Sequence, residues 1–166
     1  MAVPARTADT FEYALNTYSD MLLRIAYRNV KVLADAEDIT QEVFIKLIQR
    51  DKGFESPEHE KAWLIRVTVN KCRDFLKSER RKKETALGTG IDIPAAEEKT
   101  SGTEVTEAVM CLPEKYRNVL YLYYYEGYTS VEISKILLKP QSTIRNYLSE
   151  ARNVLRERLG DDFNEE

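Results

Sequence analysis

The chain has 166 residues, of which 32% are charged and 43% hydrophobic, and its formal net charge is -3. This composition is typical of a globular protein with polar helix surfaces, and no apolar run approaches the roughly 20 residues that cross a bilayer. The N-terminus lacks the apolar core of a secretion signal. Cys72 and Cys111 have no CxxC spacing and no histidine partners. We therefore expect a cytoplasmic protein with no membrane insertion, metal or cofactor, and with both cysteines buried.

The first half of the chain contains three amphipathic segments whose apolar residues recur at helical spacing. They are predicted to run over residues 11–29, 34–50 and 58–83. Between the second and third segments, Ser56 can cap a helix and Pro57 suits a first helical turn. The third and longest segment has a predicted core stripe of Ala62, Ile65, Val69, Cys72 and Leu76.

Residues 84–103 contain three glycines and a proline and show little periodicity, which predicts a mobile linker. The helical pattern resumes at Glu104, breaks at Leu112-Pro113 and continues to Glu126. No strand alternation is visible. The expected fold is therefore all-α, with two small helical domains over residues 8–83 and 104–160 joined by the flexible linker 84–103.

Residues 127–152 have the pattern of a helix-turn-helix. Thr129 and Glu132 predict a capping box, and Pro140 suits the first turn of the second helix. The second helix would bury Ile144, Leu148, Ala151, Leu155 and Leu159 and direct outward Thr143, Arg145, Asn146, Ser149, Arg152 and Asn153. Such groups suit the major groove of DNA, although two amphipathic helices also occur in ordinary helical bundles.

Charge is segregated along the chain. From Trp63 to Lys83 there are eight basic residues against two acids, and Arg66, Asn70, Arg73, Lys77 and Arg80 fall on one helix face. This stripe predicts contact with nucleic-acid phosphates, with a solvated helix face as the alternative. Trp63 and Phe54 could stack on unpaired bases or belong to the core, and the core is favoured for Trp63.

An acidic patch lies on the outward side of the second predicted helix, formed by Glu37, Asp38, Gln41 and Glu42. Acids near a helix N-terminus favour the helix dipole, and the same density suits docking of a basic partner. The only histidine, His59, is predicted to be a solvated loop residue. No residue set has the spacing of a catalytic site, so we expect no enzyme activity.

Three segments, in order, resemble bacterial RNA polymerase sigma factors of the extracytoplasmic-function type. DAEDITQEVF (35–44) and KAWLIRVTVNKCRDFL (61–76) resemble sigma region 2, and LPEKYRNVL (112–120) with the helix-turn-helix resembles region 4. The resemblance implies a sigma factor that binds core RNA polymerase, directs it to promoters and helps to open the -10 region. A free-standing helix-turn-helix regulator that does not bind core polymerase is the alternative.

The resemblance also implies roles for matching residues. Contact with the β′ clamp of the polymerase would fall to Glu37, Asp38, Gln41 and Glu42. Capture of a flipped -10 base would fall to the loop Asp51, Lys52, Gly53, Phe54, Glu55 and Ser56. The non-template strand would be held by Arg66, Asn70, Arg73, Lys77, Arg80 and Arg81. The -35 duplex would be contacted by Ser142, Thr143, Arg145, Asn146, Ser149 and Arg152.

Further partners are implied by the same resemblance. The linker would approach the active centre of the polymerase, and an anti-sigma factor is expected. Core packing is predicted for most of the rings of Tyr121, Tyr123, Tyr124, Tyr125 and Tyr128, with an exposed subset meeting the polymerase β flap or an inhibitor.

Three positions depart from the family pattern. Leu138 stands in the helix-turn-helix turn where glycine is usual, so we expect that turn to differ or to be slightly strained. Ser142 replaces a glycine that often precedes the threonine of the recognition helix. Glu150 stands where a basic residue is common.

Overall fold

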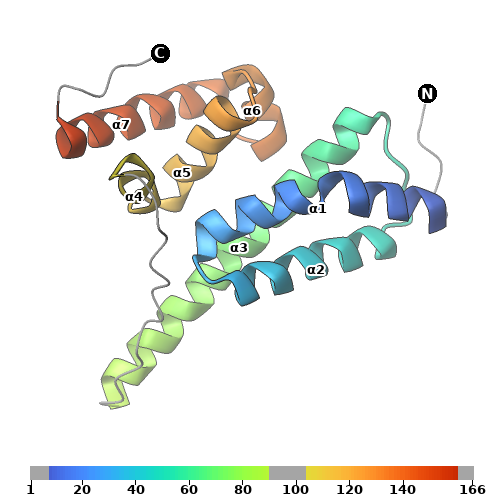
Figure 1. Cartoon of the computed structure of the whole chain (residues 1–166), viewed down its shortest axis with the longest axis horizontal. Coiled ribbons are helices and arrows are strands. Elements are labelled where there is room, and N and C mark those ends of the chain that lie inside the picture. Colours follow the sequence, from blue (N-terminus) through green and yellow to red (C-terminus); the bar gives the residue numbers. More distant parts are fainter. Residues whose placement is uncertain (1–7, 90–103, 161–166) are drawn as a thin grey trace. The chain divides into compact units, whose positions relative to one another are not determined.

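The computed structural model describes residues 8–89 and 104–160, which form helices joined by short loops, with no strand among them (Figure 1). The chain divides into two compact units, Met1–Glu98 and Lys99–Glu166. The predicted all-α class is confirmed. No helix in the described part of the chain combines the length and the apolar character needed to cross a membrane.

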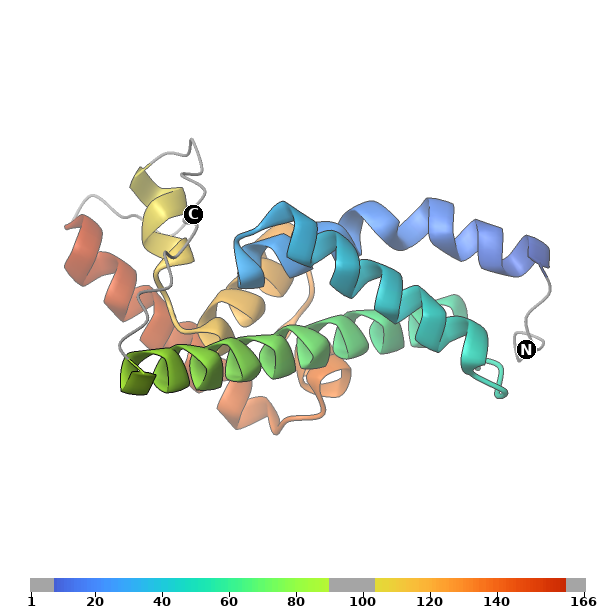
Figure 2. The same cartoon turned by 90° about the horizontal axis from the view of Figure 1, so that it is seen from below.

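The first unit is a bundle of three helices: α1 (Ala8–Val30), α2 (Leu33–Gln49) and α3 (Pro57–Thr89). Each packs against the other two, as Figures 1 and 2 show. The helices form because their apolar residues recur on one side, and burial of those residues stabilises the bundle. Its core includes the fully buried side chains Leu22, Ile25, Val43, Leu47, Leu64 and Ile65.

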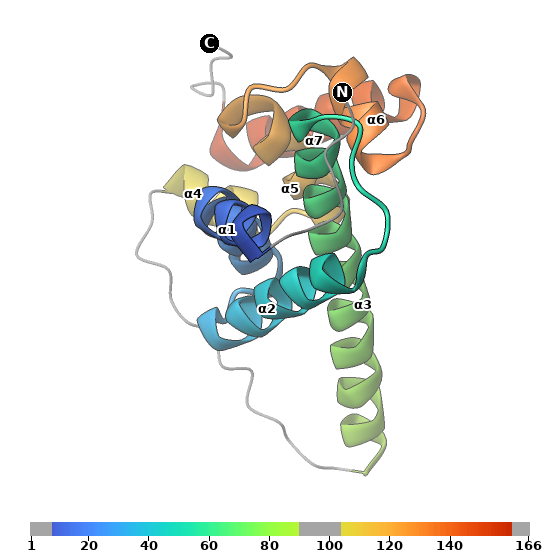
Figure 3. The same ribbon diagram turned by 90° about the vertical axis from the view of Figure 1, so that its right-hand side faces the viewer.

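Helix α3 differs from its sequence prediction at the C-terminal end. It continues to Thr89 instead of ending near Lys83, and its last turns extend beyond α1 and α2 (Figure 3). Glu84, Ala86 and Leu87 are good helix formers, so helix propensity favours continuation past Lys83. The predicted linker is therefore wrong for residues 84–89, and residues 90–103 lie outside the described residues.

The buried face of α3 also differs from the predicted stripe. Leu64, Val67 and Thr68 are buried together with Ile65 and Cys72, whereas Ala62, Val69 and Leu76 are only half-buried. The buried face is broader than a single stripe because α1 and α2 both pack against this helix. Burial of Cys72 is confirmed, whereas Cys111 is exposed, contrary to expectation.

The second unit begins with α4 (Glu104–Met110) and α5 (Glu114–Leu120), which continues into a π-helical turn, η1 (Tyr121–Tyr125). The predicted break at Leu112-Pro113 is confirmed. Arg117 spans this break, because its Nη1 atom donates a 2.8 Å hydrogen bond to the Met110 carbonyl. A buried side chain thus fixes the angle between the two helices.

The helix-turn-helix is formed by α6 (Ser130–Leu137) and α7 (Gln141–Leu159). Thr129 and Glu132 make the predicted capping box. Pro140 lies immediately before α7 and not inside its first turn. Leu138 ends α6 in the left-handed conformation (φ 53°, ψ 47°), which confirms the strain expected at this position.

Candidate interfaces with nucleic acid and polymerase

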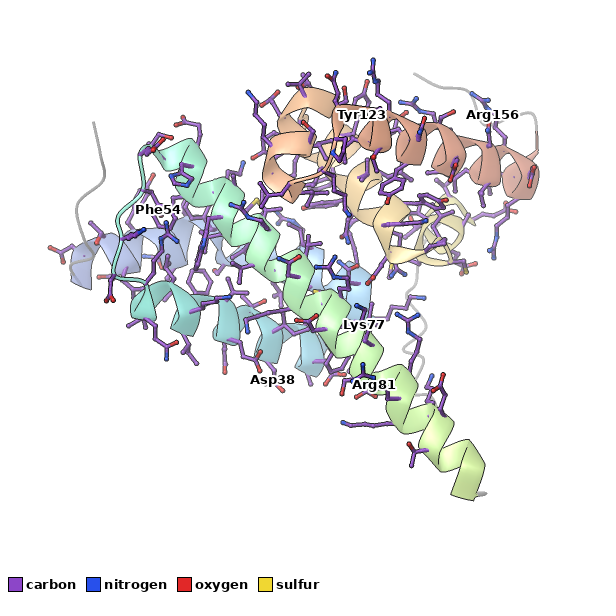
Figure 4. The ribbon with its side chains drawn as sticks, turned by 180° about the vertical axis from the view of Figure 1, so that it is seen from behind. Asp38, Phe54, Lys77, Arg81, Tyr123 and Arg156 are labelled. Carbon is purple, nitrogen blue, oxygen red and sulfur yellow. The ribbon has the colours of Figure 1, made fainter. Side chains whose placement is uncertain are left out.

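The acidic patch on α2 has the predicted exposure. Glu37, Asp38, Gln41 and Glu42 are all exposed, and Figure 4 shows Asp38 on α2. Glu42 forms one ion pair, at 3.4 Å to Lys71 of α3. A hollow between α2 and α3 extends the patch and is lined by Asp35, Asp38, Ile39, Glu42, Lys71, Asp74, Phe75 and Ser78.

The pKa of Asp35, in the first turn of α2, shows the effect of the negative charges around this hollow. Partial burial raises the pKa of its carboxyl above the ordinary value, and the nearby carboxylates of Glu79 and Asp38 raise it further, against an opposing effect of Lys82. The negative charges therefore repel one another in the free protein, and a cationic partner placed there would relieve the repulsion.

An apolar groove between α1 and α2 was not anticipated from the sequence. It has a volume of about 480 Å³, and Phe11, Leu15, Phe44, Ile45 and Ile48 are among the residues that line it. Ile45 and Ile48 are more than half exposed on α2. Ile48 had been predicted to face the core together with Ile39, Val43, Phe44 and Leu47, so its exposure corrects that prediction. Ile45, outside that predicted stripe, was the sequence signal for this groove.

The loop between α2 and α3 presents most of its predicted residues to solvent. Asp51, Lys52, Gly53 and Glu55 are exposed, and Ser56 is half-buried. Ser56 caps α3, since its Oγ accepts a 3.1 Å hydrogen bond from the His59 amide. The side chains available to a base are therefore those of the exposed residues of this loop.

Phe54 is an exception within the loop, because it is only 3% exposed and belongs to the core (Figure 4). Its ring packs against Trp63, with ring centroids 5.6 Å apart. Stacking of Phe54 on a base is therefore excluded in this conformation. Trp63 is half-buried, which agrees with the favoured core interpretation.

His59 is not the solvated loop residue that was predicted. It lies in the first turn of α3, and its Nδ1 accepts a 3.1 Å hydrogen bond from the Glu55 amide. Its ring meets Phe54 edge-on at a centroid distance of 5.3 Å. The acidic neighbours in the sequence had suggested solvation, but the ring faces the loop.

The basic residues of α3 form the predicted stripe along one helix face. Lys77 and Arg81 are labelled in Figure 4. Asn70, Lys77, Arg80 and Arg81 are exposed, whereas Arg66 and Arg73 are half-buried. Arg73 Nη2 donates a 2.7 Å hydrogen bond to Asn70 Oδ1, which aligns two members of the stripe.

Helix α7 places most of the proposed -35 residues at the surface. Ser142, Arg145, Asn146 and Ser149 are exposed, and Thr143 and Arg152 are half-buried. Arg152 Nε donates a 2.7 Å hydrogen bond to the Tyr124 hydroxyl, and its guanidinium lies 5.5 Å from the centre of that ring. No pattern in the sequence predicted this contact between η1 and α7.

The tyrosine cluster is mostly outside the core, contrary to prediction. Tyr121 is buried, but Tyr124 and Tyr125 are 49% and 58% exposed, and Tyr123 and Tyr128 are half-buried. The five tyrosines occupy several sides of the π-helical turn and the loop after it, so one core cannot accommodate them all.

Glu150 of α7, which stands where a basic residue is common in the family, has a hydrogen-bond partner in α5. The Tyr116 hydroxyl donates a hydrogen bond to the Glu150 carboxylate, and this bond raises the pKa of Tyr116 above its ordinary value. The ring of Tyr116 also packs edge-on against Tyr147 at 5.6 Å. Glu150 is therefore used in holding α7 against α5.

A helix-turn-helix in one unit and a basic helix with an acidic neighbour in the other define a DNA-binding transcription protein. Comparison with known families makes the class specific: sigma-70 region 2 matches residues 14–82, and sigma-70 region 4 matches residues 103–155. The chain belongs to the sigma-70 family of RNA polymerase sigma factors, in its extracytoplasmic-function (ECF) group.

Relatives and solved structures agree with this assignment. The ECF RNA polymerase sigma factor SigW of Bacillus subtilis is 25% identical over 92% of this chain and 90% of its own length. ECF sigma factor BldN of Streptomyces coelicolor is 28% identical over 95% of this chain, which spans 63% of BldN. The sigma factor RpoE of Bartonella quintana, solved in complex with the anti-sigma factor NepR, has the same fold (TM-score 0.71, 24% identity, covering 93% of this chain and 99% of RpoE).

Proposed function

We propose that this chain binds core RNA polymerase, directs it to specific promoters and helps to open the -10 region, with no catalytic activity of its own. The observation that carries the proposal is the match to regions 2 and 4 in order, on two compact units that each expose a basic helix. Since its partners are the polymerase and the chromosome, we place its action in the cytoplasm.

Docking on the polymerase would use the acidic patch of α2. Glu37, Asp38, Gln41 and Glu42 are exposed along one helix, and Glu42 forms an ion pair with Lys71. Complementary charge steers association and fixes the register of docking. We assign these four residues to contact with the β′ clamp.

Opening of the -10 region would use the loop and the stripe of α3 together. Extruding a base costs a few kcal/mol, so contacts to the captured base and to the separated strand must offset that cost. The exposed residues of the loop would contact the base. The backbone of the non-template strand would be followed by the stripe and by the adjoining Arg81. The stripe consists of Arg66, Asn70, Arg73, Lys77 and Arg80.

Recognition of the -35 duplex would use the exposed face of α7. Thr143, Arg145 and Asn146, in its first turns, would meet base edges in a major groove. Arg152, two turns later, is assigned to a phosphate. Ser142 and Ser149 complete the proposed face.

Further contacts would regulate or complete the complex. The solved structure of similar fold is a complex with an anti-sigma factor, and we propose that an anti-sigma factor also holds this chain inactive. The exposed Tyr124 and Tyr125 suit the polymerase β flap. Residues 90–103 would approach the polymerase active centre.

In vitro transcription tests the function directly. Sigma-free core polymerase would be incubated with fragmented genomic DNA from the source organism, with and without this chain. Discrete transcripts that require the chain are the expected result. Tight duplex binding without any such transcript would support the free-standing regulator instead.

A further inference from the structure

The loop of residues 51–56 is tied at its N-terminal side by a residue outside it. Arg50 ends α2, and its Nε donates a 3.1 Å hydrogen bond to the Lys52 carbonyl. Its guanidinium lies 4.4 Å from the centre of the Phe54 ring and 5.2 Å from that of Trp63. One side chain therefore fixes the loop backbone and also covers the buried phenylalanine.

A second tie holds the C-terminal side of the loop. His59 accepts a hydrogen bond from the Glu55 amide through Nδ1, while its own amide donates to Ser56 Oγ. Its ring packs edge-on against Phe54. The imidazole must therefore be unprotonated at Nδ1 for the bond to Glu55 to exist.

The two ties meet at Phe54. This ring is in contact with Arg50, Trp63 and His59, and it is almost fully buried. The neighbouring Lys52, Gly53 and Glu55 remain exposed. The loop is thus anchored at its middle and at both ends, which leaves its exposed groups in one arrangement.

We propose that Arg50 and His59 are positioning residues that hold the loop of residues 51–56 in the conformation that selects a -10 base. This inference rests on the proposed function, because it assigns base capture to the loop. A binding site that is ordered before the ligand arrives loses less conformational entropy on binding and discriminates better. Arg50 and His59 act through the loop and need not touch the base.

Four variants separate the contacts. Arg50→Ala removes the hydrogen bond to the loop and the cover over Phe54. His59→Phe keeps a ring against Phe54 but loses the acceptor for the Glu55 amide, whereas His59→Asn keeps an acceptor and loses the ring. Lys46→Ala removes one positive charge one turn earlier on α2, from an exposed residue, and is the matched control for Arg50.

The measurement is transcription by reconstituted holoenzyme from the promoter that the wild-type chain selects, with each -10 and -35 position randomised in turn. We expect Arg50→Ala and His59→Phe to lower base selectivity about three- to tenfold at one or two adjoining -10 positions, as the loss of one or two hydrogen bonds would. Selectivity at -35 positions stays unchanged. His59→Asn restores most of the lost selectivity, and Lys46→Ala retains the wild-type profile.

Two results would overturn the inference. One is an unchanged -10 profile in both Arg50→Ala and His59→Phe. The other is an equal loss of base selectivity at every -10 and -35 position. Such a loss would reflect a general loss of folded protein, which thermal melting of each variant checks. If the wild-type chain directs no transcription at all, the proposed function itself fails, and the inference with it.

Discussion

At the scale of single residues, polar side chains near the proposed DNA contacts are held by aromatic rings. Arg50 lies over Phe54, Arg152 donates to the Tyr124 hydroxyl, and Glu150 accepts from Tyr116. An aromatic ring restricts the conformations of a long side chain that packs on it. The charged group loses little hydration, because it stays near the surface. Such fixed polar groups suit a protein that reads base sequence.

Arg145 provides a test of base readout. It is exposed in the first turns of α7, which we propose contact base edges in the major groove. We expect Arg145→Ala to cost about 1–3 kcal/mol of binding free energy and to relax selectivity at one -35 position, as loss of a base-edge contact does. Competition binding of holoenzyme to promoters substituted at each -35 position measures this. A uniform loss over all sequences would make Arg145 a phosphate contact.

Leu138 provides a test of backbone strain. A leucine in the left-handed conformation is unfavourable by about 1–2 kcal/mol, and this side chain is 69% exposed, so little burial would be lost on truncation. We expect Leu138→Gly to raise the free energy of unfolding of the second unit by about 0.5–1 kcal/mol after the extra entropy of unfolded glycine is subtracted. Chemical denaturation followed by circular dichroism measures the change.

The first unit supplies the internal control for this experiment. Trp63, the only tryptophan, lies in α3, so its fluorescence follows the unfolding of the first unit. The tryptophan transition should not move in Leu138→Gly. A lower midpoint for the second unit would show that Leu138 makes a stabilising contact that outweighs its strain.

At the scale of helices, the positions of the elements followed from hydrophobic periodicity, but several boundaries and environments did not. The end of α3 was missed because Gly88 and the weak periodicity after Lys83 predicted a linker, whereas Glu84, Ala86 and Leu87 continue the helix on propensity alone. The contact of Tyr124 with Arg152 joins segments 28 residues apart. The contacts of His59 with Phe54 and Glu55 form where the loop turns into α3. Periodicity within one segment carries no information about such contacts.

The acidic patch of α2 is tested by charge reversal. We expect Asp38→Lys combined with Glu42→Lys to weaken binding to core polymerase by at least about tenfold, because like charges would then face a basic clamp. Asp9→Lys with Glu12→Lys makes the same charge change on exposed residues of α1 and is the matched control. Equal core affinity for the two double variants would refute the assignment of the patch.

The raised pKa of Asp35 predicts a pH dependence of the same interaction. Partial burial, with repulsion from Glu79 and Asp38 and against the opposing effect of Lys82, raises the pKa of Asp35 and favours its protonated form in the free protein. A basic partner in the hollow would lower this pKa, so docking at acid pH would release a proton, and core affinity would weaken as the pH falls towards the raised pKa of Asp35. Calorimetry in buffers of different ionisation enthalpy measures the number of protons released on docking. Asp35→Asn should abolish the part of this release that comes from Asp35.

At the scale of the whole molecule, the net charge of -3 conceals two basic surfaces separated by acidic sequence. Helix α3 carries Arg66, Arg73, Lys77, Arg80 and Arg81 in the first unit, and α7 carries the basic residues of the second. We expect attraction to DNA to be a local property of these surfaces. Average charge therefore gives the wrong sign for the interaction.

Salt dependence tests this separation of charge. Each phosphate neutralised on single-stranded DNA adds about 0.7 to the slope of log affinity against log salt concentration. We expect Lys77→Ala with Arg80→Ala to reduce the slope for holoenzyme on a single-stranded -10 oligonucleotide by about 1.4. The slope for a -35 duplex should stay constant, and a change in both slopes would contradict two separate DNA surfaces.

The division into two compact units, each with its own buried core, also bears on how promoter preferences diverge. A recombination event within residues 90–103 would exchange one unit and leave the described helices of the other unit intact. Preferences for the two promoter elements can then be inherited separately and combined anew. A regulatory repertoire can therefore expand by the shuffling of halves as well as by the slow accumulation of point substitutions.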